Sequence, residues 1–284
     1  MKKIKEPAAC YIVAVSGGID SVVLLDMLSK KKNLELVVAH FDHGIRDDSH
    51  LDAEFVKNLS IMYNLPFESK REELGREASE EIARDCRYRF LREIAAKYNG
   101  IVVTAHHSDD VVETIAINLL RGTGWRGLAV LDSDITRPLT HLTKKEILSY
   151  AKKHKLRWRD DSTNASDKYL RNRVRLQTAK MSDDEKLQVL CLWETQKDIK
   201  KVVDQEVRSL VGDGPSYSRY FFTHVGEASA IECLRCITGA RLTRPQMLKL
   251  LFNIKTIKAG KKYTAGGGVK INFTSRNFTV ELLK

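Results

Sequence analysis

The strongest constraint on the fold is a short passage near the start of the chain, where a hydrophobic stretch runs into two adjacent glycines. Residues 11–15 are uncharged and rich in β-branched side chains, which is typical of a buried strand. Gly17 and Gly18 then allow a tight turn, and the hydrophobic pattern from Asp20 to Lys30 predicts a helix. This succession points backbone N–H groups and the positive end of a helix dipole at one place. The passage therefore predicts a site for a phosphate group.

This glycine loop differs from two familiar phosphate-binding patterns. A Walker A loop has a lysine after its last glycine, but Ile19 follows Gly18 here. In the dinucleotide-binding pattern one residue separates the first two glycines, whereas Gly17 and Gly18 are adjacent. An ordinary tight turn without a ligand is the alternative that this stretch alone leaves open.

Two further hydrophobic strands end in polar clusters. Residues 34–41 lead into the polar residues at 40–46, and residues 101–105 lead into His106–Asp110 and a helix that ends near Leu120. Strands that alternate with helices predict parallel βαβ units, in which ligands gather beyond the carboxyl ends of the strands. We therefore predict an α/β fold with a doubly wound, mostly parallel sheet, and one crevice shared by the three clusters.

Hydrophobic spacing predicts the helices that flank this sheet. Leu51, Phe55, Leu59 and Met62 would form the buried face of one helix. A longer helix is predicted over 80–98. Both helices follow a strand, as βαβ units require.

The pattern changes beyond residue 120. Capping boxes predict helices over 143–154 and from 182 to about 210. Helices near 228–238 and 244–252 precede strands around a triple glycine, 266–268, which we interpret as a hairpin turn. We predict three parts: a nucleotide-binding catalytic domain at 1–180, a connecting helix and linker at 181–212, and a small α+β domain at 213–284.

The charge of the chain favours a polyanionic partner. The formal net charge is +11 at pH 7, which makes nucleic acid the leading partner class. Between residues 152 and 175, nine basic side chains stand against three acidic ones, a difference of +6. Aromatic residues among cations suit phosphate neutralisation with base stacking, although a basic surface without a ligand is the alternative. The predicted nucleic-acid contacts are Lys152, Lys153, Arg157, Trp158 and Arg173.

The sequence carries no sign of export or of a disulfide framework. No hydrophobic run is long enough to span a bilayer, and no signal-type core precedes the first strand, so we expect a cytoplasmic protein without a membrane partner. The five cysteines are an odd number scattered through predicted strands and helices. We interpret Cys233 and Cys236, the only C-x-x-C pair, as buried structural thiols on a helix.

Six motifs occur in the order found in the PP-loop ATP pyrophosphatase superfamily, and within it the chain most resembles the tRNA(Ile)-lysidine synthetase family. The superfamily signature Ser-Gly-Gly-x-Asp-Ser stands here as residues 16–21. The resemblance covers residues 10–178, with Ile45 in place of a usual leucine and Trp125 widening a glycine loop. Residues 228–283 resemble the first C-terminal module of that family. The other motifs are His40-x-Asp42-His43-Gly44-x-Arg46, Ala105-His106-His107-x-Asp109-Asp110-x-x-Glu113-Thr114, Arg121-Gly122-x-Gly124, Arg137-Pro138-Leu139, and Asp161-x-x-Asn164 followed by Arg171-Asn172-x-x-Arg175.

The resemblance implies an ATP-dependent ligase that modifies tRNA. ATP would activate C2 of the wobble cytidine in an isoleucine tRNA with the anticodon CAU, with loss of pyrophosphate. The ε-amine of free L-lysine would then displace AMP and form lysidine. ATP would be a substrate, Mg²⁺ a cofactor, and tRNA the partner of the domain at 213–284, with a homodimer left open.

The resemblance also implies roles for the motif residues. Carboxylates suit Mg²⁺, here Asp20, Asp42 or Asp109, and arginines suit the α-phosphate and the adenylated base. Attack needs a neutral amine, and His106, Asp110 and Glu113 are left open as the group that takes its proton. The predicted ATP-binding residues are Ser16, Gly17, Gly18, Ile19, Asp20, Ser21 and His40, and the predicted catalytic residues are Asp42, His106, Asp109, Asp110, Glu113, Arg121, Arg171 and Arg175.

Three other functions use some of the same residues. A metal-dependent phosphoesterase could use the clusters at 40–43 and 106–110, but it would give the glycine loop no task. A PP-loop tRNA thiolase shares the adenylation step, yet such enzymes typically need nearby cysteines or an Fe–S cluster, and Cys233 and Cys236 are far along the chain. A basic RNA-binding module that retains nucleotide affinity is the non-enzymatic alternative.

Overall fold

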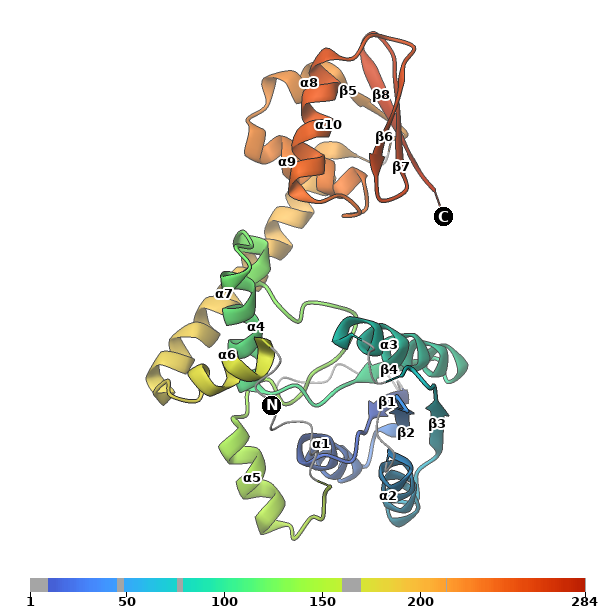
Figure 1. Ribbon diagram of the computed structural model, residues 1–284, viewed down its shortest axis with the longest axis vertical. Coiled ribbons are helices and arrows are strands. Elements are labelled where there is room, and N and C mark those ends of the chain that lie inside the picture. Colours follow the sequence, from blue (N-terminus) through green and yellow to red (C-terminus); the bar gives the residue numbers. More distant parts are fainter. Residues whose placement is uncertain (1–9, 45–48, 76–78, 160–169, 213, 284) are drawn as a thin grey trace. The chain divides into compact units, whose positions relative to one another are not determined.

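The computed structural model describes residues 10–44, 49–75, 79–159, 170–212 and 214–283. The chain divides into two compact units, Met1–Lys197 and Asp198–Lys284. The division falls within the long helix α7 (Asp183–Val211), so one helix contributes to both units (Figure 1). It also falls inside the segment predicted to connect the domains. No described helix is long and hydrophobic enough to cross a membrane.

A parallel sheet forms the centre of the first unit. Its strands are β1 (Cys10–Ala14), β2 (Glu35–Asp42), β3 (Phe67–Arg71) and β4 (Gly100–Val103), in the order β3-β2-β1-β4. All three pairings are parallel, and Thr136 adds a short parallel bridge beside Val103 of β4. The predicted α/β class with a parallel sheet is confirmed.

Helices cover both faces of the sheet, which confirms the doubly wound arrangement (Figure 1). Tyr11 and Val13 of β1 pack on the side of α1, α2 and α5, whereas Cys10 and Ile12 pack on the side of α3. A strand buried on both faces needs hydrophobic residues at every position, which explains the unbroken pattern of β1. The helices and the 3₁₀ turn of this unit are α1 (Ile19–Ser29), α2 (Ser49–Met62), α3 (Glu80–Lys97), α4 (Ser108–Leu120), η1 (Trp125–Leu128), α5 (Lys144–Lys153) and α6 (Leu170–Thr178).

A separate small core joins α4 to the first half of α7. Val111 and Ile115 of α4 pack with Val130 and Trp193, and the Trp193 indole N–H donates to the Val130 carbonyl at 2.8 Å. Helix α6 packs along α4 as well. This packing fixes the polar side chains of α4 opposite those of α6.

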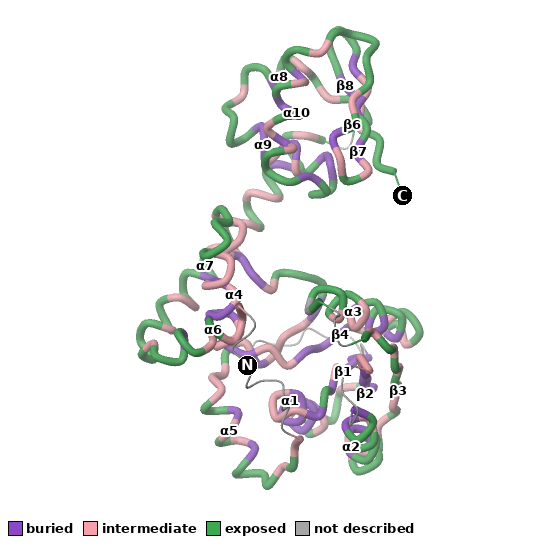
Figure 2. The backbone as a smooth tube through the Cα atoms, viewed as in Figure 1, coloured by how far each residue is buried: buried purple, intermediate pink, exposed green. Residues whose placement is uncertain are grey.

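The predicted buried face of α2 is partly wrong. Leu51 and Met62 are exposed, at 38% and 64%, because the helix turns Asp52, Val56 and Leu59 inward. Figure 2 shows the exposed outer side of this helix. Asp52 is buried because its carboxylate pairs with the guanidinium of Arg159.

The second unit is an α+β fold around an antiparallel sheet of order β5-β8-β7-β6. The triple glycine ends β6 and forms the turn into β7, and all three residues have positive φ, so the predicted hairpin is confirmed. Of the two cysteines on α9, Cys233 is buried as predicted, but Cys236 is exposed. The unit contains β5 (Ser216–Ser218), α8 (Arg219–His224), α9 (Glu227–Ile237), α10 (Arg244–Thr256), β6 (Lys262–Gly266), β7 (Val269–Phe273) and β8 (Asn277–Leu282).

Candidate functional site

Hydrogen bonds of Ser16 and Ser21 fix the conformation of the glycine loop after β1. The Ser21 hydroxyl donates to the Gly18 carbonyl at 2.8 Å, and the Ser16 amide donates to that hydroxyl at 3.2 Å. The Gly18 amide donates to Ser16 Oγ at 3.3 Å. Gly17 has φ +94°, a conformation that side chains rarely adopt, so this position needs glycine for its backbone.

Gly18 needs no glycine for the sake of the fold. Its φ is −70°, and a Cβ placed there would meet only Ser16 Oγ, at 3.5 Å, among the described residues. It precedes α1 without a side chain to cap it. The amides of the first turn, from Ile19 to Ser21, therefore have no partner within the helix. The loop presents donors and open space at one point.

Residues at the end of β2 support this loop from beside it. The buried His40 donates from Nδ1 to the Val15 carbonyl at 2.8 Å, while its buried Nε2 has no hydrogen-bond partner among the described residues. Asp42 accepts from the Gly44 amide at 2.9 Å and from Arg71 at 3.1 Å. It also accepts from the Ser49 hydroxyl at 3.1 Å. The carboxylate of Asp42 is thus engaged in shaping the chain that follows β2.

Two lysines that the sequence analysis did not select enter the site. Lys144 Nζ lies 2.5 Å from Asp20 Oδ1, and Lys186 Nζ lies 2.6 Å from Asp109 Oδ1. His107 Nε2 is 3.9 Å from Asp20 Oδ1, and its Nδ1 is 3.7 Å from Asp109 Oδ2. The loop after β1 and the one after β4 therefore meet, as predicted for strands of one sheet edge.

The ion pair with Lys186 keeps Asp109 ionised. Burial raises the pKa of this carboxyl, but the bond from Lys186, the bond from the Lys144 amide and the Lys186 charge outweigh burial and hold the pKa below its usual value. The capping boxes place both lysines in the first turns of α5 and α7. Nothing in their spacing indicates that they point at carboxylates.

A second group of charges joins α4 to α6. Arg171 donates to Asp110 at 3.2 Å and to Glu113 at 3.4 Å, and Arg175 donates to Glu113 at 3.0 Å. Glu113 is only 3% exposed. Burial raises the pKa of Asp110, but His107, His106 and Arg171 together hold this pKa below its usual value. Four predicted catalytic residues thus form one network, in which the carboxylates are largely buried and the arginines are partly exposed.

His106 lies beside this network as a neutral imidazole. Its Nδ1 is 2.9 Å from the Thr104 hydroxyl. Burial lowers the pKa of His106 to about 3, and the charges of Arg137, Arg87 and Arg171 act in the same direction. A neutral ring can accept a hydrogen bond at pH 7.

Other predicted residues lie away from this network. Arg121 is exposed at the far end of α4, about 18 Å along the helix from Asp109 at a rise of about 1.5 Å per residue. Lys152, Lys153, Arg157 and Arg173 are exposed, and Trp158 is half-buried against the core beneath α5. The motif residues Arg46, Asp161 and Asn164 lie outside the described residues.

Arg159, in the basic segment 152–175, stabilises the fold. Its amide donates to the Gly17 carbonyl at 3.0 Å, and its guanidinium pairs with the buried Asp52 of α2. The chain after α5 is thereby fastened to the glycine loop. This contact was not predicted, because it joins residues more than a hundred positions apart.

The carboxylates predicted to bind a metal ion, Asp20, Asp42 and Asp109, do not form a metal centre on their own. Among the described residues, no three His, Cys, Asp or Glu side chains are grouped to hold a metal ion. Asp20, Asp42 and Asp109 each pair with a cationic side chain instead.

Comparison with known proteins gives the family. A family model described as a PP-loop domain matches residues 1–181. The chain is 38% identical over 177 residues to a tRNA(Ile)-lysidine synthase of Thermotoga maritima, covering 58% of this chain and 43% of that protein. It is 42% identical over 183 residues to the one of Bacillus cereus, covering 58% and 38%. The chain thus covers less than half the length of these relatives.

A solved structure agrees with the fold. A U34-tRNA thiolase, NcsA from Methanococcus maripaludis with its [4Fe-4S] cluster, superposes with a TM-score of 0.59 at 15% identity, covering 70% of this chain and 75% of that one. At this identity the likeness concerns the fold alone.

Proposed function

The chain belongs to the PP-loop domain family, and on that basis we propose that it uses ATP to ligate free L-lysine to C2 of the wobble cytidine in an isoleucine tRNA with the anticodon CAU. One observation carries the proposal. A single edge of the sheet presents both an uncapped glycine loop and a network in which two largely buried carboxylates pair with two partly exposed arginines. The first suits a polyphosphate, and the second suits a zwitterionic amino acid.

In the first step, O2 of the cytidine attacks the α-phosphorus of ATP and the bond to pyrophosphate breaks. Negative charge grows on the leaving pyrophosphate, and preorganised N–H donors at that point lower the barrier most. The amides of residues 19–21, which have no carbonyl partner within the helix, supply such donors, and Lys144 and Lys186 add positive charge nearby. His40 supports the loop through its bond to Val15.

Mg²⁺ would neutralise charge on the phosphates during this step. It usually binds through one or two carboxylates together with phosphate oxygens, so a site of three protein ligands is not required. Asp20 and Asp109 fit this role because each carboxylate pairs with a lysine ammonium group that a divalent cation can replace, although Asp109 also accepts from the Lys144 amide. Asp42, with three partners of its own, fits less well.

In the second step, the lysine amine attacks C2 and AMP leaves. The carboxylates of Asp110 and Glu113 suit an ammonium group, and the guanidinium groups of Arg171 and Arg175 suit a carboxylate. The amine must lose a proton before it attacks, and Asp110 and Glu113 are the carboxylates placed to take it, whereas burial lowers the pKa of His106 to about 3 and makes its imidazole a weak base.

The exposed residues Lys152, Lys153, Arg157 and Arg173, with Trp158, are proposed to contact the tRNA, and Arg121 to contact the adenylated base. The second unit is proposed to bind another part of the tRNA. A cytoplasmic location and a homodimer remain predictions.

The test is to incubate the protein with ATP, radiolabelled lysine and an isoleucine tRNA(CAU) transcript. Label is expected in the tRNA, only when ATP is present and not with a methionine tRNA. Glu113→Gln should abolish labelling but still release pyrophosphate in a tRNA-dependent manner, because it affects only the second step. Folded wild-type protein that transfers no lysine would reject the proposal, and transfer of labelled sulfur would favour a thiolase.

A further inference from the structure

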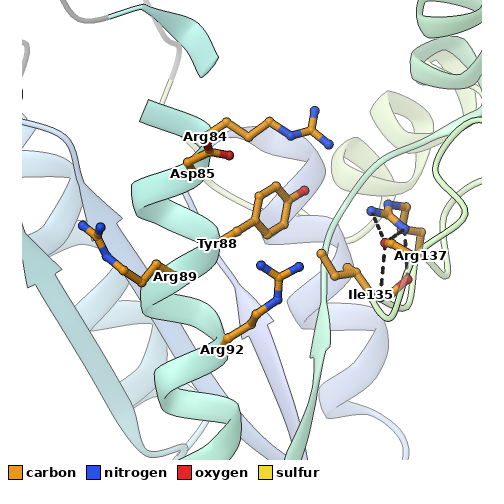
Figure 3. A pocket seen from close by; sticks show the side chains of 8 residues that line it. Arg84, Asp85, Tyr88, Arg89, Arg92, Ile135 and Arg137 are labelled. Atoms are coloured by element: carbon orange, nitrogen blue, oxygen red, sulfur yellow. Dashed lines mark hydrogen bonds between the residues drawn. The ribbon is translucent and has the colours of Figure 1, made fainter. Parts of the chain in front are cut away.

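Four arginines line a pocket that lies outside the network of Asp110, Glu113, Arg171 and Arg175. It has a volume of about 310 Å³ and lies between α3 and the segment at 133–137 of the first unit (Figure 3). One carboxylate, that of Asp85, also lines it. The motifs of the sequence analysis placed only one of its residues, Arg137, and gave it no role. The full lining is Arg84, Asp85, Tyr88, Arg89, Arg92, Ser133, Ile135 and Arg137.

The spacing of residues on α3 builds one wall of this pocket. Arg84, Tyr88 and Arg92 stand four residues apart, so they lie on one side of the helix. Figure 3 shows these three side chains directed toward the segment that carries Ile135 and Arg137. The Arg84 guanidinium lies 5.2 Å from the centre of the Tyr88 ring. The ring holds this arginine by a cation–π contact and leaves its N–H groups free for a ligand.

Two of the four arginines that line the pocket form ion pairs, and the other two do not within the described part of the chain. Arg89 pairs with Glu72 at 3.0 Å and Arg92 pairs with Asp134 at 3.4 Å, both at the protein surface. Arg84 and Arg137 have no carboxylate within ion-pair distance among the described residues. Four guanidinium groups and one carboxylate line the cavity, and the excess of positive charge favours an anionic ligand.

Arg137 is held rigidly in this wall. Its Nη1 donates to the carbonyls of Leu131 at 2.8 Å and Ile135 at 3.0 Å, and both terminal nitrogens donate to Ser133 Oγ, at 3.2 and 3.1 Å. Its buried Nε has no hydrogen-bond partner among the described residues, and Nη2 keeps one N–H group for a ligand. It follows Thr136, which pairs with β4, so it lies at the same sheet edge as His106. Its charge lowers the pKa of His106, in keeping with that proximity. The pocket thus adjoins the site where the cytidine would react.

We propose that this pocket binds a phosphate of the tRNA backbone close to the reacting cytidine, with Arg84 and Arg137 as its principal contacts. The inference rests on the proposed function, since it names a contact of that same substrate. A planar guanidinium pairs well with phosphate oxygens, and two of them fix the position of the strand. The contact would hold the base in place while ATP binds on the glycine loop.

The test measures the affinity for a fluorescent isoleucine tRNA(CAU) over a range of salt concentrations. Arg84→Ala removes an exposed side chain that makes no bond to the backbone, so the fold is expected to survive. Loss of one phosphate contact should lower the salt slope by about 0.7–0.9, which is about a five- to eightfold weaker affinity at 0.1 M salt. Arg84→Ala/Arg92→Ala should weaken binding further. Lys57→Ala, an exposed charge on α2 across the sheet, is the matched control and should change neither quantity.

Three results separate this inference from the proposed function. Binding of ATP alone should be unchanged in Arg84→Ala; weaker ATP binding would show that the pocket serves the nucleotide and would overturn the inference. The same loss should appear with an isolated anticodon stem–loop, and a loss seen only with whole tRNA would refute the placement beside the cytidine. If wild type and Arg84→Ala bind tRNA with equal affinity and slope, the pocket is no tRNA site, even where lysine transfer proceeds.

Discussion

The two glycines of the phosphate loop should respond in opposite ways to the addition of one methyl group. Gly17→Ala forces a side chain into φ +94° and should cost about 1–2 kcal/mol of stability. Gly18→Ala has an ordinary φ and a nearest contact of 3.5 Å, so it should be neutral, or stabilising by up to about 1 kcal/mol through a less flexible unfolded chain. A methyl group at Gly17 would meet the side chains of Phe55 and Val56, whereas one at Gly18 would meet only Ser16 Oγ of the loop itself and would occupy space there that a phosphate needs.

The expected loss of ATP affinity in Gly18→Ala follows from the bonds it blocks. One hydrogen bond to a charged group contributes about 1.5–3 kcal/mol, which corresponds to about 10- to 150-fold in affinity. Isothermal titration with a non-hydrolysable ATP analogue measures this loss, and thermal unfolding measures stability. In a domain of this size each kcal/mol shifts the melting temperature by about 2–4 °C. Wild-type ATP affinity in a folded Gly18→Ala protein would refute the assignment of the loop to phosphate, and so would a destabilisation as large as that of Gly17→Ala.

Three further predictions concern other parts of the molecule. Asp26 is buried and accepts from Lys30, Tyr63 and Tyr150; burial raises its pKa, but these bonds hold it below the usual value. Its stabilisation is therefore present above the unfolded pKa of about 3.9 and is lost as the pH falls through the folded value. Asp26→Asn should cost about 1.5–3 kcal/mol in urea unfolding at pH 7, and this cost should shrink as the pH falls below the unfolded pKa; a cost that stays equal over an acid titration would contradict this. Arg219 donates to the carbonyls of Ile254, Ile257 and Thr274, so Arg219→Ala should destabilise the second unit by about 1.5–3 kcal/mol, whereas the exposed control Arg276→Ala should stay within about 0.5 kcal/mol in the same thermal unfolding assay. Lys186→Ala should raise the pKa of Asp109 toward its ordinary value, which ¹³C NMR of labelled aspartate can follow; an unchanged titration would show that the Lys144 amide alone holds the carboxylate.

The sequence predicted the fold well where local pattern and burial agree. The strand at β1, the glycine loop and α1 each have a pattern that the sheet requires, and the order of strands and helices left parallel pairing as the natural topology. The face of α2 was predicted only in part, because hydrophobic spacing takes no account of a buried carboxylate such as that of Asp52. Its burial depends on Arg159, which lies far along the chain. Hydrophobic spacing carries no information about such a partner.

The residues of the candidate site were likewise predicted in part from the sequence and missed in part. Carboxylates at strand ends were found because parallel strands bring their ends together, and this placed Asp20 near Asp109. Lys144 and Lys186 were not found, because they start helices whose packing against the sheet is set by tertiary contacts. A lysine in the first turn of a helix opposes the helix dipole, and that unfavourable position is the one local signal that could have drawn attention to both.

The basic segment from 152 to 175 shows why a charge count alone does not locate a nucleic-acid surface. Arg171, Val174, Arg175 and Thr178 share the side of α6 that faces α4, so these two arginines neutralise buried carboxylates, while Arg173 on the other side is exposed. With Arg159 paired as well, three of the nine basic residues counted there serve the interior. Fewer cations of this segment therefore remain to neutralise phosphates than its charge of +6 suggests. The proposed tRNA binding would then owe part of its salt dependence to other arginines, and the pocket around Arg84 and Arg137 supplies two that form no ion pair in the described part of the chain.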